Sequence, residues 1–277
     1  MMENPYAHDF LREALWVGWI IGTVCAVLSC YLVLKGWSLM GDAISHAVLP
    51  GVVLAYLAGL PILFGAFVAG MVCALLSGYL KANSRIKEDA VLGIVFTGLF
   101  AFGLVLFSKT ATTLHLDHIL FGNILGLEPG QVERTLWTGG LMLLILVFLR
   151  RDLLLLCFDP LHARSLGMRT QILTHVLLAL IAAAVVLSME AVGILLVVAM
   201  LITPGCTGFL LSPRFEWMML IAVASTWVAF TLGIAFSFWL NASTSACIVL
   251  VQSGIFAGAW LLGPRHGLLW RRQVQRV

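Results

Sequence analysis

A carboxylate and an imidazole stand four residues apart in an otherwise apolar stretch of the chain, GDAISHAVLPG at residues 41–51. Residues i and i+4 of a helix lie on one face, one turn apart. Asp42 and His46 can therefore present an oxygen and a nitrogen to the same point in space. Such a pair can contribute to a transition-metal site, or the two side chains can simply hydrogen-bond to each other and fix the packing. Both interpretations remain open at this point.

Two side chains do not complete a metal site, because tetrahedral and octahedral ions take four to six ligands. A second subunit presenting the same motif across a two-fold axis would raise the set to two carboxylates and two imidazoles. This mixed nitrogen and oxygen set suits Mn²⁺, Fe²⁺ or Zn²⁺, and the lack of thiolates in it argues against Cu(I). The motif therefore predicts half of a metal site.

The composition indicates that membrane helices position this pair. Of the 277 residues, 61% are hydrophobic and 10% charged, and the mean hydropathy is +1.05. Soluble domains carry about 25% charged residues. Runs of about 20 apolar residues span a bilayer of roughly 30 Å. We find nine runs, at 13–34, 36–60, 61–80, 90–108, 132–150, 171–188, 191–211, 217–240 and 243–263.

The runs predict an all-α fold, a polytopic transmembrane helix bundle with about eight or nine spans (range eight to ten) and one transmembrane domain over residues 1–277. Two junctions leave the number open. Runs 36–60 and 61–80 meet at Gly59-Leu60-Pro61, and the sixth and seventh runs meet at Met189-Glu190. Either junction can be a tight hairpin or part of a re-entrant element, which usually lines a polar cavity.

The basic residues predict the orientation of the bundle. If the first run enters from outside, only Arg12, Lys109 and Arg134 of the 16 basic residues face outward. The other basic residues then lie in cytoplasmic segments: Lys35, Lys81, Arg85, Lys87, Arg150, Arg151, Arg164, Arg169, Arg214, Arg265, Arg271, Arg272 and Arg276. The positive-inside rule therefore favours an outer amino terminus and a cytoplasmic carboxyl terminus in a multi-pass membrane protein.

Asp42 is the acidic residue that lies well within an apolar run. If 36–60 is one helix of about 37 Å, His46 falls near its middle and Asp42 about 6 Å towards the cytoplasm. A charge there costs at least a few kcal/mol, so it needs a partner or a water-filled cavity. Pro50 cannot donate a hydrogen bond to the carbonyl of His46, and Gly51 adds flexibility, so we expect a helix break at the site.

Other polar residues are weaker candidates. His115, Asp117 and His118 lie in the predicted outer segment 109–131, where they can collect metal, shape an outer gate or simply belong to a solvated loop. His175, near a helix end, and Glu190, at a membrane boundary, need no special role.

Residues 151–170 form the largest predicted cytoplasmic loop. Asp159 and Pro160 are a good N-cap and first helical residue, Ala163 follows, and Gly167 is a plausible stop. These residues predict a short helix suited to docking in a groove of a partner, although a basic surface loop remains an alternative.

Motifs for enzymatic chemistry are absent from the sequence: it contains no HExxH, GxSxG or GxxxxGK[ST]. We therefore expect a transport subunit rather than an enzyme. If ATP drives transport, hydrolysis must occur on another chain.

The chain resembles the ABC-3 family of permeases, the membrane subunits of bacterial ABC importers for manganese, iron and zinc. Within this family, its sequence resembles the Sit/Yfe-type iron–manganese permeases most. The resemblance covers essentially the whole chain. Its most specific parts are GDAISHAVLPG (41–51), ILFGNILG (119–126), the loop from Asp159-Pro160 to Gly167, and the stretch from Val192-Gly193 to Thr203-Pro204-Gly205.

The resemblance implies a cytoplasmic ABC ATPase dimer, a second permease subunit that is identical or paralogous, and a periplasmic or lipoprotein metal-binding protein. It implies that Asp42 and His46 coordinate a travelling Mn²⁺, Fe²⁺ or Zn²⁺, and that the Asp159–Gly167 loop transmits the ATPase stroke. Membrane lipid is a further partner, nucleic acid is not, and no permanently bound cofactor is expected. The alternative is a secondary, ion-coupled metal transporter that works without an ATPase. An intramembrane metalloenzyme would need a third ligand and a general base at recognisable spacing.

Overall fold

The structure is a computed structural model that describes residues 9–110, 124–126 and 129–263, and within these ranges all regular structure is helical. The helices, in chain order, are α1 (Asp9–Lys35), α2 (Met40–Ala58), α3 (Ile62–Asn83), α4 (Glu88–Lys109), the 3-10 turn η2 (Ile124–Gly126), α6 (Pro129–Phe148), α7 (Arg150–Phe158), α8 (Pro160–Ser165), α9 (Thr170–Val192), α10 (Ile194–Leu211), α11 (Phe215–Leu240) and α12 (Thr244–Leu262).

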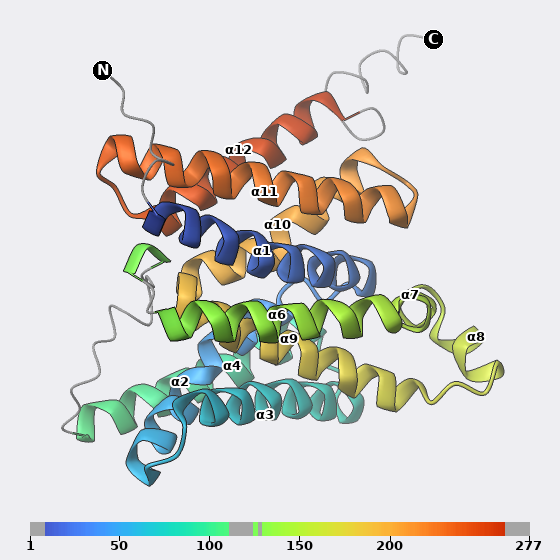
Figure 1. Ribbon diagram of the computed structural model, residues 1–277. Coiled ribbons are helices and arrows are strands. Elements are labelled where there is room, and N and C mark those ends of the chain that lie inside the picture. The colour runs from blue at the N-terminus through green and yellow to red at the C-terminus, as the bar shows by residue number, and fades with distance from the viewer. Residues whose placement is uncertain (1–8, 111–123, 127–128, 264–277) are drawn as a thin grey trace, which may run out of the picture.

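Nine helices of the described chain are long and apolar enough to cross a membrane. They are α1–α4, α6 and α9–α12. In Figure 1, α1, α3, α6 and α11 run in nearly the same direction, and α2 and α12 are inclined to them. The short α7 and α8 project from one end of this bundle (Figure 1). The predicted all-α transmembrane bundle is confirmed, and each predicted apolar run corresponds to one long helix.

Both doubtful junctions are turns between two full-length helices. Gly59 ends α2 in the left-handed conformation, with φ of 66°, and its N–H donates to the carbonyls of Ala55 and Tyr56. The second junction lies at Gly193, with φ of 79°, rather than at Met189-Glu190, which are inside α9. Glycine adopts a positive φ without the steric penalty that a Cβ would bring, so the chain can turn in so few residues.

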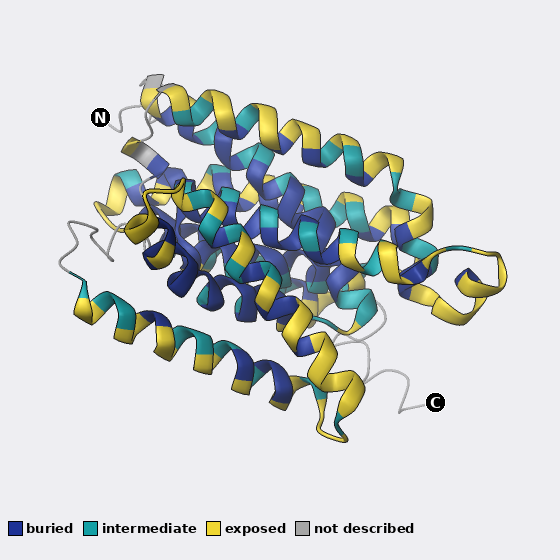
Figure 2. Cartoon of the chain, turned by 90° about the horizontal axis from the view of Figure 1, so that it is seen from below, coloured by how far each residue is buried: buried dark blue, intermediate teal, exposed yellow. Residues whose placement is uncertain are grey.

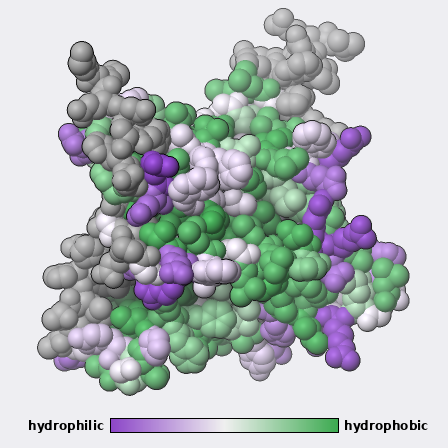
Figure 3. Space-filling view, viewed as in Figure 1, coloured by the Kyte–Doolittle hydropathy of each residue, from purple (hydrophilic) through white to green (hydrophobic). Residues whose placement is uncertain are grey.

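The four most buried spans form the centre of the bundle. About 72% of the α2 span and 67% of the α1 span are buried, followed by α9 and α10, whereas only 22% of α4 and of α6 is buried. Figure 2 shows this arrangement as buried residues in the inner helices and exposed stripes on the outer ones. A helix whose apolar side chains point outward fits contact with lipid, and Figure 3 shows hydrophobic residues over the middle of the visible face.

A close contact between α1 and α10 holds the centre together. The Ser29 hydroxyl of α1 donates to the Ile202 carbonyl at 3.1 Å and accepts from the Gly205 N–H at 2.9 Å. A Cβ at Gly205 would stand 2.5 Å from that hydroxyl oxygen. Pro204, which lies inside α10, weakens the backbone hydrogen bonding of its own helix, and the serine of the neighbouring helix supplies polar contacts at that point.

Candidate functional site

Helix α2 brings the predicted pair together. The Nε2 atom of His46 lies 3.3 Å from the Oδ1 atom of Asp42. The i,i+4 spacing places both side chains on one face of a regular helix, as the sequence predicts. The two polar atoms therefore converge on one point without any contribution from other elements.

Asp42 and His46 are partly exposed, whereas the residues around them on α2 are buried. Between residues 40 and 53, every residue is buried except Asp42 and His46, whose side chains are 28% and 32% exposed. If the pair only fixed the packing of the helix, burial against a neighbouring helix would serve as well. Instead, the most central span opens to free space where its only carboxylate and imidazole lie.

Aromatic residues of α4 hold the His46 ring. Phe96 stacks on it with a centroid distance of 5.8 Å, and Phe100 meets it edge-on at 5.5 Å. These two residues are four positions apart, so they lie on one face of α4. The two rings therefore add a contact from a second helix to an imidazole that the geometry of α2 already places beside Asp42.

The position of α2 depends on a close contact with α3. A Cβ at Gly51 would stand 2.1 Å from the carbonyl oxygen of Gly65, and one at Gly65 would stand 2.3 Å from the carbonyl oxygen of Gly51. Small residues let membrane helices approach until their backbones touch. A further contact lies nearer the pair, where the Cys73 thiol of α3 donates to the Ala43 carbonyl at 3.7 Å.

Two details of the predicted site need correction. Residues 36–39 form a turn, so α2 begins at Met40 and Asp42 lies in its first turn. His46 is therefore about 9 Å from the start of a helix of about 28 Å, between its amino-terminal end and its middle. The predicted break is also absent, because α2 continues through Pro50 to Ala58; Pro50 removes one backbone hydrogen bond and leaves the helix intact.

The described part of the chain does not complete the ligand set. Within it, no group of three or more His, Cys, Asp and Glu side chains is placed to hold a metal ion. The five cysteines other than Cys206 are buried. Within the described residues, Asp42 and His46 therefore have no third His, Cys, Asp or Glu side chain placed beside them to hold a metal ion.

The secondary candidates are distributed over both ends of the bundle. His115, Asp117 and His118 lie outside the described residues. Glu190 accepts a hydrogen bond from the Gln131 amide at 3.3 Å, which joins α9 to α6. His175 lines a cavity between the ends of several helices, away from the Asp42–His46 pair.

The predicted short helix of the 151–170 loop is α8. The Asp159 carboxylate accepts from the N–H groups of Leu161 and His162 at 3.0 and 2.9 Å, and Pro160 is the first helical residue. Ala163 is fully buried, and Gly167 follows the helix with φ of 79°. Leu161 and Leu166 are 75% and 61% exposed, so α8 presents apolar side chains outward.

Sequence reasoning missed the aromatic neighbours of His46 and the ion pair that Lys81 forms with Glu88. Phe96 and Phe100 read as ordinary apolar residues of a membrane span, and no periodicity shows which helix lies against α2. Lys81 and Glu88 read as charges flanking a loop. Only the packing of α2 against α4 shows that the two rings contact His46, and only the packing of α3 against α4 shows that Lys81 pairs with Glu88.

Comparison with known proteins gives one consistent result. The model of the ABC 3 transport family matches residues 7–263. The chain is 51% identical to the chelated iron transport system membrane protein YfeD of Yersinia pestis, over 94% of this chain and 87% of that protein. It is 47% identical to the manganese transport system membrane protein MntB of Synechocystis, over 98% and 90% of the two chains.

A solved structure has the same architecture. A chain of PsaBC from Streptococcus pneumoniae, in complex with Fab, matches with a TM-score of 0.86 at 35% identity, over 96% of each chain. The match to the family model, the identities and the shared fold all cover nearly the full length. The chain therefore belongs to the ABC 3 transport family.

Proposed function

We propose that this chain is the membrane-spanning permease subunit of an ATP-driven importer of Mn²⁺ or Fe²⁺, and that Asp42 and His46 bind the cation on its way through the membrane. The relatives named above are described as chelated iron and manganese transport proteins. Zn²⁺ accepts the same nitrogen and oxygen ligands, but neither of those descriptions mentions it.

The observation that carries the proposal is the selective exposure of the pair. Asp42 and His46 are the only residues between 40 and 53 that the bundle leaves unburied, and their polar atoms are 3.3 Å apart. A carboxylate within a membrane span costs at least a few kcal/mol unless it has a partner or water. A travelling divalent cation is a partner that is present only during transport.

A second permease subunit, identical or paralogous, completes the site in this proposal. One chain offers two ligands, whereas a divalent transition metal takes four to six. A two-fold axis beside the exposed pair would bring two carboxylates and two imidazoles together. The phenylalanines of α4 would then separate the site from lipid on either side.

ATP hydrolysis belongs to a separate ABC ATPase dimer, and α8 is the element that receives its movement. The Asp159 cap fixes the start of α8, buried Ala163 holds it against the bundle, and the exposed Leu161 and Leu166 offer an apolar surface. The 151–170 loop would lie in the cytoplasm with the carboxyl terminus, as the basic residues predict. The permease would lie in the bacterial inner membrane. It would receive the cation from a periplasmic or lipoprotein metal-binding protein.

The test is Mn²⁺ and Fe²⁺ uptake by the complete transporter with Asp42→Ala or His46→Ala. Both variants should lose uptake while the permease still inserts and assembles with its ATPase. Glu133→Ala is the matched control, because Glu133 is a carboxylate exposed on α6, and it should transport normally. Uptake at the wild-type rate in both site variants would contradict the proposal.

The same preparation decides between ATP-driven and secondary transport. Proteoliposomes that hold the permease without its ATPase should show no uptake under an ion gradient, and addition of the ATPase and ATP should restore it. Uptake that needs only the gradient would make the chain a secondary transporter.

A further inference from the structure

Lys35, the last residue of α1, binds the end of α7. Its ammonium donates to the carbonyl of Leu156 at 3.2 Å. The residue four positions after Leu156 is Pro160, which has no N–H to donate, so Lys35 supplies a donor that the chain itself cannot. One turn earlier on α1, the hydroxyl of buried Tyr31 donates at 3.4 Å to the carbonyl of Arg150, the first residue of α7. Helix α1 therefore holds both ends of α7.

The short helices α7 and α8 are joined without a linker. Asp159 is the single residue between them, and its N–H donates to the Leu155 carbonyl of α7 at 2.9 Å while its carboxylate caps α8. Lys35 also faces α8, because it lines one space of about 170 Å³ together with Pro160 and Arg164. A displacement of α8 would therefore reach Lys35 directly and through α7.

On its other side, Lys35 contacts the turn that leads into α2. Its ammonium lies 5.4 Å from the centroid of the Trp37 ring, a cation–π distance. The Trp37 N–H donates to the Leu32 carbonyl of α1 at 2.8 Å, and the Trp37 carbonyl accepts from the Met40 N–H at 3.0 Å. Met40 is the first residue of α2, and Asp42 lies in the same turn of that helix. Trp37 thus connects Lys35 to the start of the helix that carries the pair.

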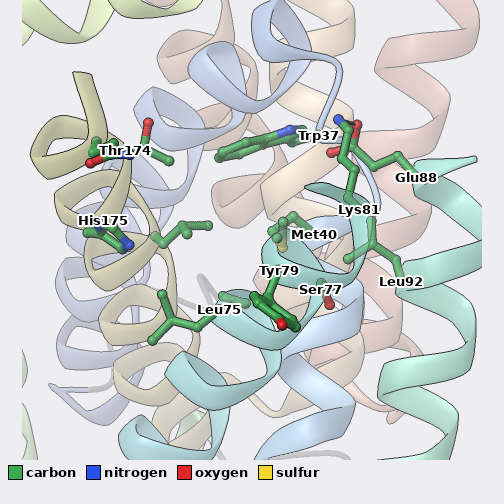
Figure 4. A pocket seen from close by; sticks show the side chains of 14 residues that line it. Trp37, Met40, Leu75, Ser77, Tyr79, Lys81, Glu88, Leu92, Thr174 and His175 are labelled. Atoms are coloured by element: carbon green, nitrogen blue, oxygen red, sulfur yellow. Dashed lines mark hydrogen bonds and ion pairs between the residues drawn. The ribbon is translucent and has the colours of Figure 1, made fainter. Parts of the chain in front are cut away.

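The turn has free space beside it. Figure 4 shows the Trp37 ring among the residues that line the cavity of about 400 Å³ at this end of the bundle, with Thr174 of α9 on one side and Lys81 and Glu88 on the other. Close-packed interiors deform little, so an element that moves needs such space. Lys35 borders the smaller space and Trp37 the cavity, which leaves room for both side chains to shift.

We propose that Lys35 is a positioning residue that carries the movement of α8 to the cation site, through α7 on one side and through Trp37 to the start of α2 on the other. This role rests on the proposed function. Chains of hydrogen bonds and packed side chains can carry coupling between distant sites. A shift of the first turn of α2 would move Asp42 relative to any ligand outside this helix, and so change the affinity for the cation.

The contact of α8 with α9 does not offer the same connection. The Arg164 guanidinium donates to the Thr170 hydroxyl at 3.0 Å, which ties α8 to the first residue of α9. Neither Asp42 nor His46 lies on α9, whereas the contacts of Lys35 lead within a few residues to Asp42. We therefore test the connection at Lys35.

The test measures Mn²⁺ uptake and ATP hydrolysis in the same proteoliposomes, which hold the complete transporter. Lys35→Met removes the ammonium and keeps a long unbranched side chain. Mn²⁺ taken up per ATP hydrolysed should fall at least about fivefold, because hydrolysis continues without moving α2. Trp37→Leu leaves the contact with Leu156 in place and should lower the ratio in the same way. Lys35→Arg should restore it, since a guanidinium can donate to the carbonyl and stack on the indole.

A second measurement separates this role from simple support of the start of α2. Mn²⁺ binding to the purified transporter is compared with and without a non-hydrolysable ATP analogue. The analogue should change the affinity of the wild type for Mn²⁺, and this change should disappear in Lys35→Met. The affinity without the analogue should keep its wild-type value, whereas a lost support would lower it. Lys87→Met is the matched control, since Lys87 is an exposed lysine at the start of α4, and it should behave as the wild type in both assays.

Two results would overturn the role of Lys35: a wild-type ratio of uptake to hydrolysis in Lys35→Met or Trp37→Leu, or a loss of Mn²⁺ affinity without nucleotide in Lys35→Met that accounts for its lower uptake. Either result, together with loss of uptake in Asp42→Ala, would leave the proposed function standing. Wild-type uptake in Asp42→Ala would instead remove the proposed function itself.

Discussion

Replacing Gly51 by alanine tests whether the α2–α3 contact positions the cation site. The new Cβ would lie 2.1 Å from the Gly65 carbonyl oxygen and 2.5 Å from the Ala69 Cβ. Ordinary van der Waals contact begins near 3.4 Å, so the two helices must separate locally by about 1.3 Å, the difference between 3.4 and 2.1 Å. The atoms in the way are largely backbone, and they cannot rotate aside as a flexible side chain would.

A shift of this size matters because metal coordination tolerates little. Metal–ligand distances stay within about 0.2 Å of their preferred values, and Gly51 is only five residues from His46 on the same helix. Overpacking should cost about 1–3 kcal/mol of stability. It should also weaken the apparent affinity for Mn²⁺ at least about tenfold, because α2 carries Asp42 and His46, the two ligands proposed for this chain.

The assay is concentration-dependent Mn²⁺ uptake by the reconstituted transporter, together with thermal unfolding with and without Mn²⁺. Gly65→Ala should behave like Gly51→Ala, since its Cβ meets the Gly51 carbonyl at 2.3 Å. Gly254→Ala in α12 is the matched control, because nothing lies within 4 Å of its added Cβ. Wild-type affinity in both Gly51→Ala and Gly65→Ala would refute the positioning role of the contact.

Three further changes test the proposed role of α8, the contact between α1 and α10, and the orientation of the bundle in the membrane. Asp159→Ala removes two hydrogen bonds from the start of α8, which should destabilise this helix by about 1 kcal/mol. Uptake per ATP hydrolysed should therefore fall, and Asp159→Ser should restore it. An unchanged ratio of uptake to hydrolysis in Asp159→Ala would contradict the role of the cap. Ser29→Ala removes both contacts to α10 and should lower the free energy of unfolding by about 1–3 kcal/mol, while Ser165→Ala, on exposed α8, should not. Arg85→Cys should react with an impermeant maleimide only from the cytoplasm and Ala242→Cys only from outside, and the reverse pattern would invert the bundle. Burial raises the pKa of the Cys157 thiol to about 11, so it stays protonated at neutral pH and should contribute little labelling of its own.

The sequence by itself determined the class of the fold and the identity of the pair. Hydrophobic run length decides where a chain can span a bilayer, because water is absent there and every backbone group must bond within its own helix. The i,i+4 spacing of Asp42 and His46 is a local property of helical geometry, so their convergence to 3.3 Å needed no knowledge of the other helices. The same holds for α8, whose Asp159 cap and Gly167 stop act within a few residues.

The start of α2 and the second junction were harder to place. The predicted run began at residue 36, but residues 36–39 form a turn. Trp37 and Leu39 in this turn are apolar, so the start of the apolar run does not mark the start of the helix. The correct start moves Asp42 into the first turn of α2, near the end of the bundle where the cavity lies. The junction at Gly193 depended on one backbone dihedral angle, which hydropathy does not report.

Only the tertiary structure decided what surrounds the pair. Phe96 and Phe100 contact His46 because α4 packs against α2, and Gly51 meets Gly65 because α3 packs on another side of it. In lipid, all outward faces of these spans are similarly apolar, so hydropathy does not select the neighbour of a helix. The aromatic neighbours of His46 and the contact between Gly51 and Gly65 follow from shape complementarity between separate helices.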